Sequence, residues 1–240
     1  MCVYSPAYTN DNTNMDLQLN NKMALLTGST AGIGFAIARQ LAAEGAGVII
    51  NGRTQERVSA AVDKIKAETG NAEVTGIVAD FASPEQVASL IRKVPQVDIL
   101  INNVAIFEPK AFADITDQDW LRFYEINVMS GIRLSRAYFD HMLKQNWGRI
   151  IFISSESALQ IPAEMIHYGM TKTAQLAVAR GLAELTRGSG VTVNSVLPGP
   201  TLSEGVGGFI ENLARDQQKS VEEVEPVSYT HLTLPTILRV

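Results

Sequence analysis

Several absences in the sequence narrow the classes of protein to which it can belong. The 240 residues contain a single cysteine, Cys2, so neither an internal disulfide nor a cysteine-based metal cluster can form within the chain. No stretch reaches the roughly 18 uninterrupted apolar residues that a membrane-spanning helix requires. The first 21 residues contain no lysine, no arginine and no apolar segment typical of a secretory signal. We therefore expect a cytoplasmic protein with no membrane partner.

An excess of positive charge is absent as well. Lysine and arginine number 20 against 25 aspartates and glutamates, which gives a net charge of −5 at pH 7. Proteins that bind nucleic acid usually concentrate lysine and arginine to contact the phosphates. No nucleic-acid partner is therefore expected. Hydrophobic residues make up 46% of the chain, which is enough for a sizeable core.

The chain is organised as alternating strand-like and helix-like segments after a polar start. Residues 1–14 are predicted to be a disordered leader. Strands that are buried on both faces form continuous apolar runs, and their alternation with helices is typical of a parallel, doubly wound sheet. We predict a single α/β domain of Rossmann type over residues 15–225. Its expected strands are Met23–Leu26, Val48–Ile50, Val74–Val78, Ile99–Ile101, Ile150–Ile153 and Val191–Val196, and its clearest helices are Ile33–Ala43, Thr54–Glu68 and Ser83–Arg92.

A glycine-rich segment, Thr27–Gly34, lies between the first predicted strand and the first predicted helix. Glycines at this junction permit a tight turn and a close approach of the backbone to a pyrophosphate, and the helix N-terminus offers free N–H groups to the phosphates. An ordinary glycine-rich turn is the alternative. The interpretation that we favour is a dinucleotide-binding turn, with cofactor contacts from Gly28, Ser29, Thr30, Gly32, Ile33 and Gly34.

The end of the second predicted strand indicates which dinucleotide is bound. An acidic side chain there would hold the ribose 2′-hydroxyl of NAD, whereas this chain has Gly52 followed by Arg53, whose guanidinium suits a 2′-phosphate. We predict NADP(H) as the preferred cofactor, with NAD(H) possible and a solvated surface arginine as the alternative role for Arg53. Asp80, after the third strand, is predicted to contact the adenine or to cap the helix near Ser83.

Tyr168 and Lys172 are four residues apart, which places both on one face of a helix. A cation near a phenol stabilises the phenolate and lowers the tyrosine pKa from its ordinary value of about 10. Such a tyrosine exchanges a proton with a carbonyl or alcohol oxygen near neutral pH. The pair therefore predicts an acid–base site.

These motifs, together with four more, make the chain resemble the short-chain dehydrogenase/reductase family from about residue 22 to residue 201. The overall pattern is similar to that of bacterial 3-oxoacyl-carrier-protein reductases. The additional matches are the segment Asn102–Ala105, the helix residue Asn127, the active-site residue Ser155 thirteen positions before Tyr168, and the turn Pro198–Gly199.

The resemblance implies a hydride transfer between a nicotinamide and a carbonyl or secondary alcohol, with four catalytic residues. Tyr168 would donate or accept the proton, and Lys172 would hold the cofactor ribose and lower the tyrosine pKa. Ser155 would bind the reacting oxygen, and Asn127 would support a water relay towards Lys172. Further cofactor contacts are implied for Asn103, Pro198, Gly199 and Thr201, besides Tyr168 and Lys172.

Three functions remain open at this stage. The first is a carbonyl reductase or alcohol dehydrogenase acting on a small molecule, and the second is a 3-oxoacyl thioester reductase. The third is an NADPH-binding sensor without turnover, against which the complete set Ser155, Tyr168 and Lys172 argues. The family implies a homotetramer. His141, His167 and His231 lack the spacing and acidic neighbours of a metal site, so no metal is predicted.

Two features depart from the family pattern. Val104-Ala105 replaces the usual Ala-Gly, and we expect the added bulk beside the cofactor. The Asp-Gly-Gly turn that follows the last strand in the family does not occur, so the C-terminal strand is expected to be missing. Residues 226–240 match nothing in the family pattern, and we predict that they are a non-native tail. We expect the chain as written to be less stable and less active for this reason.

Overall fold

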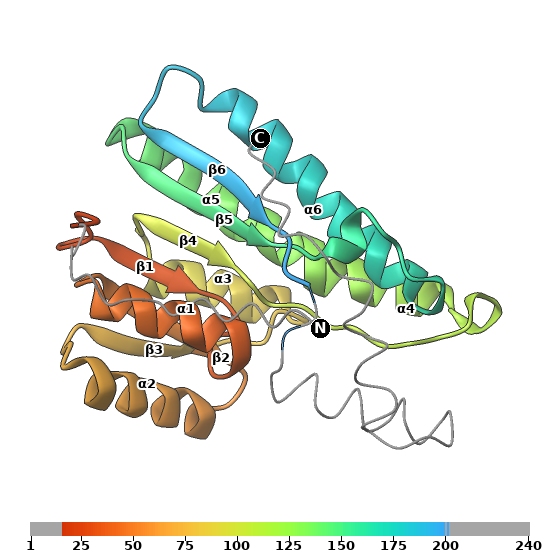
Figure 1. Cartoon of the computed structure of the whole chain (residues 1–240), viewed down its shortest axis with the longest axis horizontal. Helices are drawn as coiled ribbons and strands as arrows, with labels where there is room; N and C mark the ends of the chain where they lie inside the picture. The colour runs from red at the N-terminus through yellow and green to blue at the C-terminus, as the bar shows by residue number, and fades with distance from the viewer. Residues whose placement is uncertain (1–15, 200, 202–240) are drawn as a thin grey trace, which may run out of the picture.

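The computed structural model describes residues 16–199 and 201, and in this part strands and helices alternate as predicted (Figure 1). All six strands pair in parallel in the order β3-β2-β1-β4-β5-β6, which confirms the doubly wound, Rossmann-type sheet. The strands are β1 (Met23–Leu26), β2 (Gly47–Gly52), β3 (Val74–Val78), β4 (Ile99–Asn102), β5 (Gly148–Ile153) and β6 (Val191–Val196). The helices are α1 (Gly32–Ala43), α2 (Gln55–Thr69), α3 (Pro84–Lys93), α4 (Asp117–Tyr124), α5 (Ser130–Lys144) and α6 (Ile166–Leu185).

Local capping residues set several helix boundaries. Thr54 caps α2 by accepting from the Arg57 amide, and Ser83 caps α3 by accepting from the Gln86 amide. Pro84 occupies the first turn of α3, where its missing N–H costs no helical hydrogen bond. Helix α2 ends at Gly70, whose φ of 70° favours glycine.

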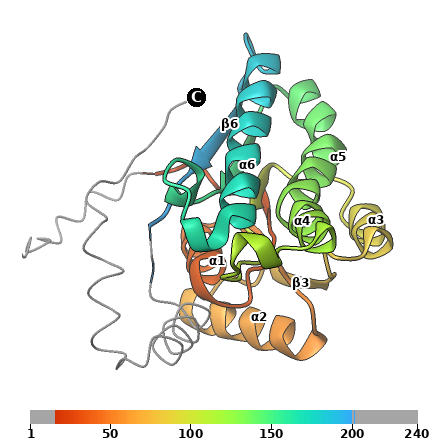
Figure 2. The same ribbon diagram turned by 90° about the vertical axis from the view of Figure 1, so that its right-hand side faces the viewer.

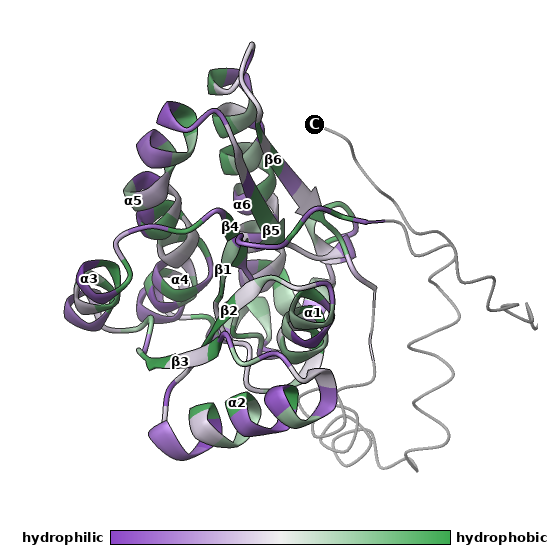
Figure 3. Ribbon diagram, turned by 90° about the vertical axis from the view of Figure 1, so that its left-hand side faces the viewer, coloured by the Kyte–Doolittle hydropathy of each residue, from purple (hydrophilic) through white to green (hydrophobic). Residues whose placement is uncertain are grey.

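The helices cover the sheet in two layers, with α1 and α2 on one face and α3 and α5 on the other (Figure 3). Ala38 and Ala42 of α1 and Ile65 of α2 pack on the first face. Leu134 of α5 and Ala179 of α6 belong to the core of the second face. A side view shows α6 beside α5 and α4 in this second layer (Figure 2).

The expectation that strands are buried on both faces holds for the inner strands and is wrong at the edges. Every residue of β2 and β4 is buried. In β6 burial alternates, because Val191 and Val193 pack towards α6 while Thr192 and Val196 are exposed. In the described part of the chain β6 pairs with β5 alone.

The strand order places the functional residues. Strands β1 and β4 are neighbours, and their connections leave in opposite directions, so the crevice at their carboxyl ends is where α/β sheets of this kind bind ligands. The predicted leader 1–14, most of the segment after Pro198-Gly199, and the predicted tail 226–240 lie outside the described residues. The expected absence of a C-terminal strand also concerns that part.

Candidate active site

The glycine turn after β1 requires glycine at three positions. Gly28 and Gly32 have φ values of 59° and 57°, in the left-handed region that side chains other than glycine seldom adopt. A Cβ on Gly34 would lie 2.6 Å from Asn103 Nδ2 and 2.7 Å from the Gly28 carbonyl oxygen. The turn therefore has no room for side chains at these positions, and its backbone atoms are exposed to whatever binds beside it.

The N-terminus of α1 is open to an anion. The residue at its N-cap, Ala31, has no side chain that could accept a hydrogen bond, and the first turn contains no acidic residue. The first N–H groups of the helix and its dipole therefore face the crevice without a competing carboxylate. This arrangement fits the pyrophosphate of a dinucleotide.

Two residues that we predict to bind the cofactor also support the turn through their side chains. The Ser29 hydroxyl is fully buried, donates to the Leu26 carbonyl at 2.8 Å and accepts from the Asn51 amide at 3.0 Å. The Asn103 side-chain amide donates to the carbonyls of Thr27 and Gly28, both at 2.9 Å. The Ser29 hydroxyl and the Asn103 amide nitrogen thus hold the turn in place, and the predicted cofactor contacts of both residues stay predictions.

Asn51 was not predicted as a site residue, although it holds the turn to the sheet. Its Oδ1 accepts from the Gly28 amide at 3.0 Å, and its Nδ2 donates to the carbonyls of Ile77 and Ala79 at 3.3 and 3.2 Å. A buried polar residue within an apolar strand is the sequence signal that could have indicated this role.

Val104 lies between the glycine turn and the core. The Val104 side chain packs against the core on the α5 face, and its amide donates to Thr27 Oγ1 at 2.9 Å. Gly28 lies directly against it, because a Cβ on Gly28 would be 3.2 Å from the Val104 Cα. The added methyl groups therefore fill core space on one side of the turn.

Arg53 and Asp80 lie where the sequence predicted, at the ends of β2 and β3. The end of β2 touches the glycine turn, since a Cβ on Gly52 would lie 2.5 Å from the Thr30 methyl group. Arg53, the next residue, is exposed at the same rim. Asp80 Oδ1 accepts from the Ala82 amide at 2.9 Å, and the cap of α3 is Ser83. Of the two roles left open for Asp80, capping that helix is therefore wrong.

Ser155 and Tyr168 are brought together by the short connection between β5 and α6. Ser155 follows β5, is 8% exposed, and accepts from the Ser157 amide at 3.1 Å. Tyr168 lies in the first turn of α6. Burial raises the pKa of the Tyr168 phenol, and a hydrogen bond with Ser155 works in the opposite direction.

Lys172 is buried one turn further along α6. Its Nζ donates to the Ile153 carbonyl at 2.9 Å and lies 5.6 Å from the centre of the Tyr168 ring. Burial lowers the pKa of Lys172 to about 7. The Lys172 ammonium points to the end of β5, and the net shift of the Tyr168 pKa is upward because burial outweighs the hydrogen bond with Ser155.

Asn127 connects three parts of the site from a π-helical turn, Glu125–Met129, between α4 and α5. Its Oδ1 accepts from the Ile106 amide at 2.8 Å, and its Nδ2 donates to the Ile106 carbonyl at 2.9 Å and to Thr171 Oγ1 at 3.1 Å. Single π-helical turns occur frequently at functional sites. Asn127 thus fixes the loop after β4 against α6.

The segment that follows β6 lies against the segment that follows β5. The Glu156 amide donates to the Pro198 carbonyl at 3.2 Å, which holds this segment against the residue that follows Ser155. Thr201 Oγ1 donates to the Gly199 carbonyl at 3.0 Å. The predicted residues Pro198 and Gly199 therefore lie near Ser155, and Thr201 is joined to Gly199.

Apolar side chains border Tyr168 on the open side. The Phe107 ring packs edge-on at 6.2 Å from the Tyr168 ring, and Ile161 packs against Gly169. Phe107, Leu159 and Ile161 are all substantially exposed.

One histidine of the described residues lies in the core beside the site. His167 is fully buried against Phe123 and Trp120, and burial lowers its pKa. Neither of its ring nitrogens has a partner in the described part of the chain. Over residues 16–199 and 201 no group of three or more histidine, cysteine or acidic side chains is placed to bind a metal ion.

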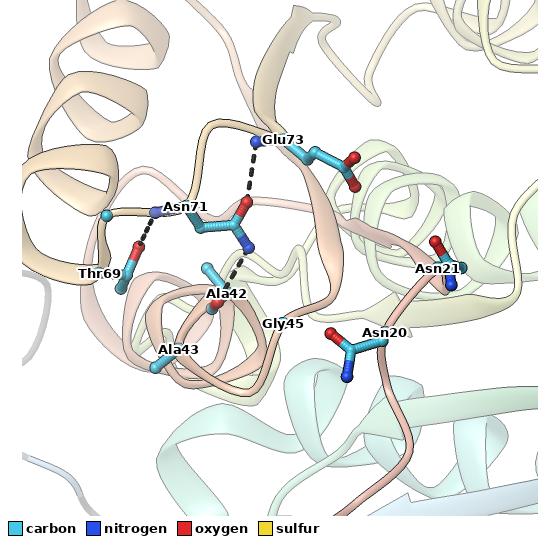
Figure 4. Close-up of a pocket in the computed structure, with 9 residues that line it drawn as sticks. Asn20, Asn21, Ala42, Ala43, Gly45, Thr69, Asn71 and Glu73 are labelled. Atoms are coloured by element: carbon cyan, nitrogen blue, oxygen red, sulfur yellow. Dashed lines mark hydrogen bonds between the residues drawn. The ribbon is translucent and has the colours of Figure 1, made fainter.

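A hollow lies away from these residues, at the end of the sheet where the strands begin (Figure 4). Its volume is about 370 Å³, and its walls are mainly asparagine side chains and backbone, including Asn20, Asn71 and Gly45. The Asn71 amide donates to the carbonyls of Ala42 and Ala46, both at 2.9 Å. Hydrogen bonds hold together the loops around this hollow, and no acid–base pair is among its lining residues.

None of the described helices is long and apolar enough to cross a membrane.

The open helix N-terminus beside an acid–base pair defines an oxidoreductase that uses a nicotinamide dinucleotide. Residues 22–214 match the family described as short chain dehydrogenase, and the chain belongs to this family. The recognition from sequence motifs is therefore confirmed, and the protein is an NAD(P)H-dependent oxidoreductase.

Three known proteins illustrate the similarity. An uncharacterized oxidoreductase, YvaG of Bacillus subtilis, is 48% identical over 211 residues, which cover 88% of this chain and 80% of YvaG. The 3-oxoacyl-[acyl-carrier-protein] reductase FabG of Aquifex aeolicus is 33% identical over 77% of this chain and 76% of its own length. The crystal structure of L-sorbose reductase from Gluconobacter frateurii with NADPH and L-sorbose has a TM-score of 0.81 and 29% identity, and the match covers 87% of this chain and 81% of that one.

Proposed function

We propose that the protein is an NADP(H)-preferring carbonyl reductase or alcohol dehydrogenase that acts on a small molecule. One observation carries the proposal. Ser155, Tyr168 and Lys172 converge at the carboxyl end of β5, beside a turn shaped for a dinucleotide. A binding protein without turnover has no need of such a proton-transfer group.

The chain's own residues account for every part of the reaction except the hydride. When bound, the nicotinamide cofactor supplies or receives the hydride at the carbonyl carbon. Ser155 donates a hydrogen bond to the reacting oxygen and orients it. Tyr168 transfers a proton to that oxygen during reduction and removes one during oxidation. Lys172, as an ammonium, favours the phenolate that remains after the proton has left.

The cofactor is held by the turn and by the rim of the crevice. The backbone of Gly28–Gly34 and the N-terminus of α1 fit the pyrophosphate. Arg53 is proposed to bind a 2′-phosphate, since it is exposed at the end of β2 and no acid precedes it. The NADPH in the L-sorbose reductase structure is consistent with this preference.

A cytoplasmic location and a homotetramer complete the proposal, as the family resemblance implies. We also propose that residues 15–225 form the oxidoreductase domain and that residues 226–240 contribute nothing to it. The apolar border of Phe107, Leu159 and Ile161 suits a ketone with an apolar substituent. The alternative substrate is a 3-oxoacyl thioester, as the 33% identity to the carrier-protein reductase of Aquifex aeolicus allows.

The experiment is NADPH oxidation measured with a panel of small ketones, sugars and 3-oxoacyl thioesters. The proposal predicts turnover with at least one ketone or sugar. Turnover confined to thioesters would favour the fatty-acid reductase. Tight NADPH binding with no turnover on any member of the panel would contradict the proposal and favour the sensor.

A further inference from the structure

A buried glutamine connects two catalytic residues. Gln175 lies on α6, three residues after Lys172, and is 2% exposed. Its Nε2 donates to the backbone carbonyl oxygen of Asn127 at 2.6 Å, and its Oε1 accepts from Lys172 Nζ at 3.4 Å. The side-chain amide thus spans the space between the ammonium and the π-helical turn.

The chemistry of the two partners fixes the orientation of this amide. A backbone carbonyl can only accept a hydrogen bond, and an ammonium can only donate one. The nitrogen of Gln175 must therefore face Asn127, and its oxygen must face Lys172. A leucine or a methionine at position 175 would fill the same space without satisfying either partner.

Asn127 and Lys172, the two partners of Gln175, also make hydrogen bonds to other residues. The side chain of Asn127 is used by Ile106 and Thr171, so its backbone carbonyl is the atom that faces α6. Of the three N–H groups of Lys172, one donates to Ile153 and one to Gln175. The remaining N–H is the one available on the side of Tyr168.

We propose that Gln175 is a positioning residue, which holds the Lys172 ammonium beside Tyr168 and connects it directly to the Asn127 carbonyl. The family resemblance implies a water relay from Asn127 towards Lys172, and the Gln175 side chain adds a direct connection between the same two residues. Gln175 contacts neither substrate nor cofactor and acts through Lys172. The inference rests on the proton-transfer role of Tyr168 given under the proposed function.

The role has a measurable electrostatic consequence. An acceptor on a buried ammonium stabilises the charged form, because the surroundings offer little solvation. Without Oε1, Lys172 carries its charge less often, and the Tyr168 phenolate is less stabilised. The Tyr168 hydroxyl then loses its proton at higher pH.

Two substitutions separate a polar connection from simple packing. Gln175→Met keeps an unbranched side chain of similar length and leaves both partners unsatisfied. Gln175→Ala opens space in which a water can bridge Lys172 and Asn127. A polar connection predicts the greater damage for methionine, and a packing role predicts it for alanine. Gln40→Met, at an exposed position of α1, is the control for the substitution itself.

The first measurement follows Tyr168 directly. Protein labelled with ¹³Cζ-tyrosine is titrated by NMR, and the Tyr168 signal is assigned by its loss in Tyr168→Phe. We expect the Tyr168 midpoint to rise by about half a pH unit or more in Gln175→Met, and by less in Gln175→Ala. An unchanged midpoint in Gln175→Met would overturn the proposal, whether or not a substrate is known.

The second measurement is turnover of NADPH with an active ketone. We expect kcat to fall about tenfold in Gln175→Met and less in Gln175→Ala, with little change in KM for the ketone. A greater loss in Gln175→Ala would assign Gln175 to packing. An inactive parent protein would count against the proposed function alone, because the NMR titration still decides the role of Gln175.

Discussion

Arg53 is the residue on which the choice of cofactor depends. It is exposed at the rim of the glycine turn, where a guanidinium can bind a 2′-phosphate in two hydrogen bonds. We predict that NADPH binds at least about tenfold more tightly than NADH, which corresponds to about 1.4 kcal/mol. Arg53→Ala should remove the preference by weakening NADPH binding alone.

Fluorescence titrations of the parent and of Arg53→Ala with both cofactors provide the measurement. Arg57→Ala, one turn into α2, is the matched control for a lost positive charge nearby. Equal affinities in the parent, or a preference for NADH, would contradict the assignment.

Lys172 makes a prediction about stability and pH. Burial lowers its pKa in the folded protein to about 7, below the ordinary value of 10.5. Between these two values the unfolded chain binds a proton that the folded chain has lost, so the free energy of unfolding rises with pH. Above this range the raised pKa of the buried Tyr168 acts in the opposite sense.

Urea unfolding at several pH values from 7 to 10 tests this prediction. The rise in stability expected for the parent should be smaller in Lys172→Met, which cannot take up a proton. Lys144→Met, at an exposed position of α5, should follow the parent. Parallel curves for the parent and Lys172→Met would show that the charge of Lys172 is not suppressed by burial.

Residue types and their order were sufficient to predict the positions of Ser155, Tyr168 and Lys172. Ser155 directly follows a strand, and Tyr168 and Lys172 lie one turn apart on the next long helix, so their spacing in the sequence determines where they lie. The roles of Ser29, Asn103, Asn51 and Gln175 were not predictable in this way. A hydroxyl or amide in a turn satisfies either a ligand or the protein, and only the three-dimensional contacts distinguish the two.

At the scale of elements, the turn between β1 and α1 combines tight packing with an open helix end. A Cβ on Gly34 would meet two backbone atoms, the Gly28 carbonyl oxygen at 2.7 Å and the Ser29 Cα at 2.9 Å. Neither atom can move without distorting the turn. We predict that Gly34→Ala costs about 1–3 kcal/mol and weakens cofactor binding.

Thermal unfolding measures the first effect and an NADPH titration the second. Gly181→Ala is the matched control, since nothing lies within 4 Å of a Cβ at that position of α6. It should raise stability slightly, by about 0.4–1 kcal/mol. If Gly34→Ala behaved like Gly181→Ala, the close packing of the turn would be refuted.

The strands and the capped helices could be predicted because apolar runs and capping residues are local signals. The π-helical turn at Asn127 could not, since its sequence continues the helical periodicity of α4 and α5. The edge strands were misjudged for a similar reason. Whether an apolar run such as β6 is covered on one face or two depends on which helices pack on it, not on its own residues.

At the scale of the whole molecule, β6 is the edge strand of the described sheet, and the proposed domain limits concern the residues that follow it. Its Thr192 and Val196 are exposed on the face away from α6. We predict that deletion of residues 226–240 leaves the melting temperature and the state of assembly unchanged, because these residues add nothing to the domain. Differential scanning calorimetry and size-exclusion chromatography compare the two chains. A markedly lower melting temperature, or loss of assembly, would make the tail an integral part of the fold.

The central claim is that Tyr168 transfers the proton while a bound NADPH transfers the hydride. The most direct test compares NADPH oxidation by the parent and by Tyr168→Phe, with an active ketone and with NADPH affinity measured in parallel. Phenylalanine keeps the ring that packs against Phe107 and removes only the hydroxyl. The account predicts that turnover falls by a factor of about 10² or more while NADPH affinity is retained. Turnover close to that of the parent would contradict it and would place the catalytic acid elsewhere.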